Sequence, residues 1–270
     1  MTDMQIRLLD MMDALHDICV KENLRYYLIG GTALGAARHQ GFIPWDDDID
    51  VGMPRPDYER LKSICRTLDS GAFCFEFPGA KDFVYPFGKF YDTRTTLIEN
   101  TRYKTKRGLY IDIFPLDGIG NTFEEGLENF KPVVHKVNLL STKTCAWRKG
   151  RKLYKNLAMV LMRHLPGISM RNLMNDIEVL SMQHDFDGCE YVANCVGNWY
   201  EKEISRREWF GTPTLYKFEG HEFYGPEMID EYLSGVYGDW RKLPPKEKQV
   251  SHHDFLLLEL NESYLKDKQT

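Results

Sequence analysis

The 270-residue sequence lacks the features of a secreted or membrane-spanning protein. It has no run of about 20 apolar residues, so we expect no segment that crosses a membrane. Acidic residues near the N-terminus interrupt the apolar stretch that a signal peptide would need. The six cysteines include no Cys-x-x-Cys pair and lie in apolar contexts, which is typical of reduced core residues. These absences together predict a cytoplasmic protein.

Acidic residues are also missing from one long stretch, residues 129–175, which contains ten Lys and Arg. The rest of the chain has 25 basic and 40 acidic residues, so the charge is strongly segregated. Within this stretch, Lys143 to Leu165 mixes basic and apolar residues in a pattern typical of a helix on an anionic bilayer, so we expect peripheral contact with the inner face of the plasma membrane. A solvated face of a helical subdomain is the alternative. No recognition module accompanies the charge, so we predict no nucleic-acid partner.

Apolar periodicity and Gly/Pro punctuation predict an α/β (α+β) fold with a mixed sheet flanked by helices. We expect three parts: a catalytic core over 1–122, a basic helical segment over 123–187 and a C-terminal part over 188–270 that packs back on the core. The expected helices cover 3–22, 33–38, 56–68, much of 123–186, a segment after Pro226 and the tail. The expected strands cover 26–29, 49–53, 73–77, 87–91, 95–98 and 109–114, with a hairpin over 218–226.

Four aspartates lie within five positions, at Asp46, Asp47, Asp48 and Asp50, where an acidic run enters the second expected strand. Residues two apart on a strand share a face, so Asp48 and Asp50 should project together with Cα atoms about 7 Å apart. Two carboxylates at this distance repel unless a cation lies between them. Mg²⁺ prefers such ligands together with phosphate oxygens, and Mn²⁺ is an alternative.

A third carboxylate fits the same site, because Asp112 is a lone acid in the apolar run around Tyr110 to Phe114. The competing interpretation of the acidic run is a turn whose side chains cap backbone amides. A calcium loop is excluded, since Val51 stands where an EF-hand needs Gly and Asp57 where it needs Glu. We therefore predict Asp48, Asp50 and Asp112 as metal ligands and catalytic residues.

The Gly30-Gly31-Thr32 turn precedes a short helix, and glycines there let backbone N–H groups approach a phosphate. Alone this signal is weak, because any tight turn can use two glycines. Followed some eighteen residues later by Asp48 and Asp50, it becomes specific.

These residues resemble the nucleotidyltransferase superfamily, and the string GGTALGAARHQGFIPWDDDIDV resembles the LicD phosphotransferases within it. Further similar blocks are GKFYDTRT, YIDIFPLDG, FEGHEFYGP and YGDW followed by Pro-Pro. The resemblance implies a nucleotidyltransferase-like fold and transfer of a phospho-alcohol, most often phosphocholine from CDP-choline, onto a sugar hydroxyl of a lipid-linked teichoic acid or lipopolysaccharide precursor. The similar fukutin-related transferases use CDP-ribitol, so the donor stays open.

Under this hypothesis Asp48 and Asp50 hold the metals that bridge the donor diphosphate, and Asp112 helps to deprotonate the sugar hydroxyl. Asp46 is expected on the same face and Asp47 turned away from it. Trp45 could stack on a base or on choline, or could be a core residue. The substrate-binding candidates are Gly30, Gly31, Thr32, Arg38, Trp45, Asp47, Lys89, Arg107 and His252.

Two other function classes compete with this one. A nucleotidyltransferase would transfer NMP from an NTP to a protein or small molecule and release pyrophosphate. A non-catalytic nucleotide- or metal-binding module would bind without turnover.

Overall fold

The computed structural model describes residues 1–147, 152–163, 169–251 and 255–266. Its centre is a mixed sheet in the strand order β1-β2-β7-β4-β3, with β8 paired to β7 and β9 to β8. β2 and β7 run parallel, and the other neighbouring pairs are antiparallel. The strands are β1 (Tyr27–Leu28), β2 (Asp50–Pro54), β3 (Phe73–Glu76), β4 (Gly88–Asp92), β7 (Tyr110–Gly120), β8 (Tyr191–Ala193) and β9 (Ile204–Arg206).

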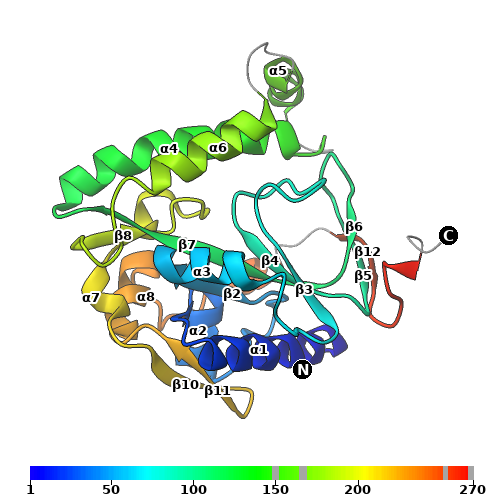
Figure 1. Ribbon diagram of the computed structural model, residues 1–270, viewed down its shortest axis with the longest axis horizontal. Coiled ribbons are helices and arrows are strands. Elements are labelled where there is room, and N and C mark those ends of the chain that lie inside the picture. The colour runs from blue at the N-terminus through cyan, green and yellow to red at the C-terminus, as the bar shows by residue number, and fades with distance from the viewer. Residues whose placement is uncertain (148–151, 164–168, 252–254, 267–270) are drawn as a thin grey trace.

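Helices cover both sides of this sheet, so the predicted α/β (α+β) class is confirmed. In Figure 1, α4 and α6 lie side by side above β7, and α1 lies below it. The α-helices are α1 (Asp3–Lys21), α2 (Gly30–His39), α3 (Arg55–Ile64), α4 (Phe123–Thr144), α5 (Leu153–Arg163), α6 (Met170–Ser181), α7 (Arg207–Phe210) and α8 (Ile229–Tyr237). Two 3₁₀ turns are η1 (Tyr200–Glu203) and η2 (Lys246–Lys248).

Two smaller sheets complete the fold. A hairpin pairs β10 (Thr214–Phe218) with β11 (His221–Gly225), as the sequence predicted. The other sheet has the order β12-β5-β6, formed by β5 (Thr96–Glu99), β6 (Lys106–Arg107) and β12 (Phe255–Glu259). β12 and β8 bring C-terminal residues into sheets with strands from the first half of the chain. The three-part domain division stays a prediction.

α1 illustrates how local sequence determines an element. Thr2 caps its N-terminus, and Thr2 and Gln5 bond reciprocally in a capping box. One face then buries Leu8, Met11 and Leu15 in the core. The helix ends within one residue of the predicted boundary.

The expected end of the strand over 109–114 is wrong, although Pro115 and the Asp117-Gly118 pair are strand-ending signals. The strand continues to Gly120, and β8 pairs with it from Asp117 onward. Pro115 is tolerated because β4 pairs with β7 only as far as Ile113, so the missing proline N–H breaks no bond on that edge.

The predicted helical tail is also wrong, because residues 255–259 form strand β12 along the edge of β5. That edge offers unpaired backbone groups, which outweigh the local preference of a short apolar run. The six cysteines all lie in the described residues and none forms a disulfide, but only Cys19, Cys189 and Cys195 are buried, so the prediction of core positions holds for those three. Among the described helices, none combines the length and apolarity needed to cross a bilayer.

Candidate active site

Parallel pairing of β2 and β7 places Asp50 directly opposite Asp112. The Asp50 N–H donates to the Thr32 hydroxyl at 2.9 Å, and its carbonyl accepts from Ile29 at 3.2 Å. The Asp112 N–H donates to the Ile49 carbonyl at 3.1 Å. The backbone therefore fixes two carboxylates side by side, where like charges destabilise a sheet.

The other three aspartates belong to the turn before β2. Asp48 precedes the strand, which begins at Asp50, so the predicted strand alternation does not position it. Carboxylate oxygens of Asp46, Asp47 and Asp48 nevertheless lie within 4.8 Å of one another. The expectation that Asp47 turns away from this group is wrong, because a turn does not impose the two-residue alternation of a strand. A hydrogen bond from the Ser251 hydroxyl holds Asp47.

Burial and neighbouring negative charge perturb both strand aspartates. Burial, then the charges of Asp48, Asp112 and Asp46, hold the Asp50 pKa well above its ordinary value. Burial also raises the pKa of Asp112, to about 6, although Lys89 opposes the shift. Both pKa values are thus raised in the metal-free protein, and further positive charge at the site would lower them.

Lys89 is the buried cation at this site. On β4 it lies opposite Asp112 and is 1% exposed, with Nζ 2.8 Å from Asp112 Oδ1. Its ammonium also lies 3.1 Å from the ring centroid of Tyr110 and 4.2 Å from that of Tyr85. These contacts make Lys89 a fixed partner of Asp112. Its predicted role in substrate binding stays a prediction.

The N-terminus of α2 borders the acidic cluster, which consists of Asp46, Asp47, Asp48, Asp50 and Asp112. Gly30 has φ +55°, which favours glycine, and its N–H donates to the Tyr232 hydroxyl at 3.0 Å. A Cβ at Gly31 would lie 2.8 Å from Asp46 Oδ2, so only glycine lets this carboxylate approach the helix end. The two glycines are thus the first residues of α2 rather than a separate turn before it. The helix dipole favours negative charge there.

The remaining substrate-binding candidates lie in different environments. Arg38 donates to the Trp240 carbonyl at 2.9 Å, and Trp45 packs half-buried against the core. Arg107 donates to Glu76 at 2.8 Å and to two backbone carbonyls. His252 lies outside the described residues. Substrate contacts of all four stay predictions.

The donor set fits Mg²⁺ or Mn²⁺. Hard carboxylate oxygens from Asp46, Asp47 and Asp48 lie together, and Asp50 lies among like charges. Asp112 Oδ1 is buried and, among the described residues, has no aligned hydrogen-bond donor despite its ion pair with Lys89. An oxygen without an aligned donor can accept a metal ion or another ligand that approaches from the side of the other aspartates.

Two tyrosines of this site were not predicted as site residues. Tyr232 holds the Gly30 amide, and the Tyr237 hydroxyl lies 3.9 Å from where a Gly30 Cβ would stand. Tyr237 begins the YGDW block that supported the resemblance, and this was the signal that could have identified it. Tyr232 lies in α8, the helix expected after Pro226.

Comparison with known proteins relates part of the chain to a family. A family model described as "LicD/FKTN/FKRP, nucleotidyltransferase domain" matches residues 23–139. Residues 23–139, under half of the chain, are therefore similar to the LicD family. This domain contains all five aspartates of the acidic cluster as well as Lys89, so the predicted resemblance is confirmed.

Relatives extend the match over most of the chain. The chain is 28% identical over 257 residues to the lipopolysaccharide cholinephosphotransferase LicD of Haemophilus influenzae, covering 93% of this chain and 95% of that protein. It is 32% identical over 95 residues to the human ribitol 5-phosphate transferase FKRP, covering 34% of this chain and 17% of that protein. Both relatives are transferases by name. An uncharacterized protein of Rickettsia prowazekii is 42% identical over 59 residues, 22% of each chain.

Proposed function

We propose that this LicD-like transferase moves phosphocholine from CDP-choline onto a sugar hydroxyl of a lipid-linked teichoic acid or lipopolysaccharide precursor and releases CMP. The observation that carries the proposal is the placement of Asp50 opposite Asp112, beside three further carboxylates. Such a cluster weakens the fold unless it binds cations that a diphosphate also needs. The relatives named for phospho-alcohol transfer support the same chemistry.

Bound Mg²⁺ would neutralise charge on the donor's phosphate oxygens, with Asp48, Asp50 and Asp112 as ligands. The protein's own part is to hold these groups still. Thr32 fixes the Asp50 backbone, and Lys89 fixes the Asp112 side chain. The amide end of α2 adds positive potential beside the acids, which suits a phosphate approaching the site.

The transfer step needs a base for the acceptor hydroxyl. The sugar oxygen attacks the phosphorus that carries choline, a new O–P bond forms, and the P–O bond to CMP breaks. Asp112 accepts the hydroxyl proton in this scheme. Its pKa is about 6 without metal, and a bound Mg²⁺ would lower it, so the carboxylate is ionised at neutral pH and can accept a proton.

The direct test is incubation with CDP-choline, CDP-ribitol and CDP-glycerol, with and without Mg²⁺, with CMP release as the readout. We expect Mg²⁺-dependent CMP release that is fastest with one CDP-alcohol and increases when a saccharide acceptor is added. Release of pyrophosphate from an NTP instead would support the nucleotidyltransferase alternative. Nucleotide binding without any product would support a non-catalytic module.

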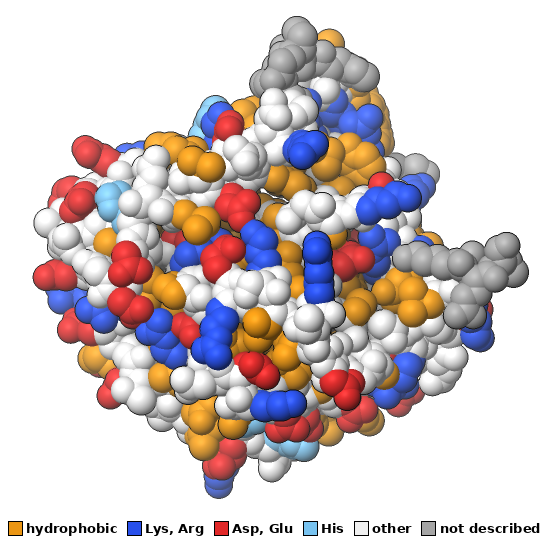
Figure 2. All heavy atoms as spheres, viewed as in Figure 1, with side chains coloured by type: hydrophobic (Ala, Val, Ile, Leu, Met, Phe, Trp, Pro, Cys, Tyr) orange, Lys and Arg blue, Asp and Glu red, His pale blue; other side chains and the backbone are white. Residues whose placement is uncertain are grey.

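We also infer that the enzyme works at the inner face of the plasma membrane, in contact with anionic lipid. α5 projects from the body of the protein at the top of Figure 1. Four apolar residues of α5 are 49% to 72% exposed: Leu153, Tyr154, Leu157 and Leu161. Figure 2 shows hydrophobic and basic side chains together on this projecting part. An apolar stripe inside a stretch that lacks acidic residues complements an anionic bilayer.

Liposome co-sedimentation tests this location. Vesicles of phosphatidylcholine with phosphatidylglycerol should pellet the protein, and vesicles of phosphatidylcholine alone should pellet much less. A Leu153→Glu/Leu161→Glu variant should lose most of the binding, since each charge near the surface contributes about 1 kcal/mol. The matched control is Val179→Glu, an exposed apolar residue on α6. If the α5 variant and the Val179→Glu control pelleted equally, α5 would not be the membrane-binding segment.

A further inference from the structure

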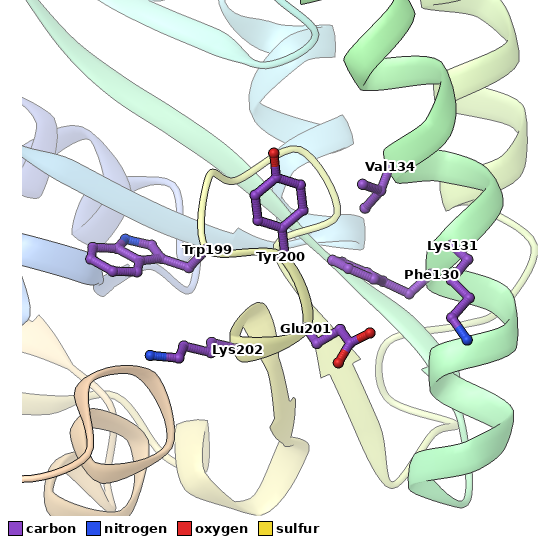
Figure 3. A pocket seen from close by; sticks show the side chains of 7 residues that line it. All are labelled: Phe130, Lys131, Val134, Trp199, Tyr200, Glu201 and Lys202. Carbon is purple, nitrogen blue, oxygen red and sulfur yellow. The ribbon is translucent and has the colours of Figure 1, made fainter.

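A pocket of about 430 Å³ lies between α4 and the turn that contains η1. In Figure 3 the lining side chains come from α4 on one side and from the facing turn on the other. The lining residues are Phe130, Lys131, Val134, Trp199, Tyr200, Glu201 and Lys202. Aromatic rings therefore form much of its surface, and charged groups complete it.

The pocket is a neighbour of the acidic cluster. The Trp199 ring meets the Tyr237 ring edge-on, with centroids 5.2 Å apart. The Tyr237 hydroxyl and the Asp50 carboxylate both lie within 4 Å of the point where a Gly30 Cβ would stand. Tyr237 thus lies between the pocket wall and the residues around the Asp50 carboxylate.

The turn that carries the aromatic residues is held in an unfavourable conformation. Tyr200 has φ +54°, a left-handed value that costs a bulky residue energy and is enriched at ligand sites. The Glu203 carboxylate fixes the turn by accepting a hydrogen bond from the backbone N–H of Trp199 at 3.0 Å. A Cβ at Gly197 would lie 2.2 Å from that carboxylate, so glycine is needed there. The surrounding structure therefore enforces the exposed positions of Trp199 and Tyr200.

Building on the proposed function, we propose that this pocket binds the sugar ring that receives the phospho-alcohol. Trp199 and Tyr200 are 47% and 58% exposed, and such rings offer rigid contact area at low entropic cost. One face of a sugar ring presents C–H groups, which suit the electron-rich face of an aromatic ring. Lysine donors and a glutamate acceptor at the rim match its hydroxyls. The volume accommodates roughly one or two sugar rings.

The charge of the pocket favours a neutral sugar over the choline group of the donor. A quaternary ammonium also binds aromatic faces, but it is repelled by nearby cations. Lys131 and Lys202 place two positive charges at the pocket against the single negative charge of Glu201. The Lys202 ammonium lies 5.9 Å from the Trp199 ring centroid, so the pocket already has a cation next to this ring.

Saturation-transfer NMR tests the pocket without requiring turnover. The probes are methyl β-galactoside, methyl β-glucoside and N-acetylglucosamine, with choline chloride as the competing class. We expect saturation of ring protons on at least one saccharide, lost in Trp199→Ala and in Tyr200→Gly. Glycine tolerates φ +54°, so Tyr200→Gly removes the ring without loss of folding. The matched control Trp147→Ala removes a tryptophan that is 49% exposed elsewhere and should keep the signal.

Kinetics with CDP-choline and a saccharide acceptor give the second measurement. Trp199→Ala should raise the acceptor KM about tenfold with the donor KM changed less than twofold, as expected for lost acceptor binding. Saccharide signals that persist in both pocket variants, pocket-dependent choline signals, or a rise in the donor KM alone would overturn the assignment. Failure of the wild type to release CMP from any CDP-alcohol would instead reject the proposed function, while the NMR result still decides the pocket.

Discussion

Strands β2 and β7 pair in parallel, and carboxylates lie at both ends of the ladder that they form. At one end Asp50 stands opposite Asp112, so two negative charges meet. Just beyond the other end Asp117 meets Arg55, with nitrogen–oxygen distances of 2.6 and 3.0 Å in a bidentate pair. The same two strands therefore present an electrostatic conflict at one end and a satisfied ion pair at the other.

The difference separates a functional acid from a structural one. Asp117 is fully buried, but both of its oxygens have guanidinium partners, so it has little capacity left for a ligand. Asp112 is 14% exposed, and its oxygen near Lys89 lacks an aligned donor. A protein keeps such an unfavourable arrangement where a ligand relieves it.

The largest effect on stability is expected at the end of the ladder where Asp117 pairs with Arg55. Asp117→Ala should lower the free energy of unfolding by about 3 kcal/mol, because it removes the bidentate partner of the buried Arg55 guanidinium and leaves it only the half-buried Glu59 at 3.0 Å. Urea denaturation at pH 7 measures this change. The double variant Arg55→Met/Asp117→Leu should recover much of the loss. A loss below about 1 kcal/mol in the single variant would remove the distinction between the two ends.

The acidic end should respond in activity instead. Asp112→Asn and Asp50→Asn should each reduce kcat at least about 100-fold, the scale of one lost electrostatic stabiliser. CMP release under saturating Mg²⁺ measures the change, and circular dichroism verifies folding. Asp57→Asn, which removes a carboxylate paired with Arg25 away from the cluster, is the control and should keep most activity. Wild-type turnover in Asp112→Asn would disprove the proposed role.

The acidic pair was predictable because it depends on short-range rules. A lone acid in an apolar strand and a run of aspartates both indicate a ligand, and Asp50 and Asp112 needed only adjacent strands to meet. The strand expected over 109–114 stopped short of Asp117, because an Asp-Gly pair is a turn signal unless a distant strand and Arg55 override it. The side on which Asp47 lies depends on the turn geometry, which alternation does not determine.

The aromatic pocket could not be predicted, since it exists only where Trp199 and Tyr200 pack beside α4, which precedes them by more than fifty residues. The residues of the turn show neither helical nor strand periodicity. Likewise, the α5 sequence predicted an amphipathic helix, but exposure of its apolar face depends on what packs against it. Long-range packing of this kind is invisible to a local pattern.

A smaller change should appear in stability at the acidic end. The pKa of Asp50 is raised in the folded protein, so its contribution to stability is present at low pH and is lost as pH rises above the ordinary aspartate value. At pH 8 without metal, the free energy of unfolding of Asp50→Asn should therefore equal that of the wild type or exceed it by up to about 1 kcal/mol. Urea denaturation measures this difference. Mg²⁺ should stabilise the wild type more than the variant. Loss of stability in Asp50→Asn at pH 8 would contradict the conflict inferred for this end.

The pH profile gives the finest test, because Lys89 opposes the rise of the Asp112 pKa. Removing this cation in Lys89→Met should raise the pKa of Asp112 further, so the acidic limb of kcat/KM should move to higher pH. Each unit of displacement lowers activity on that limb about tenfold. Lys89→Arg keeps the charge and should displace the limb less. An unmoved limb in Lys89→Met would mean that Asp112 does not titrate as the base. Lys89 would then serve the fold alone, as Arg55 does at the other end of the ladder.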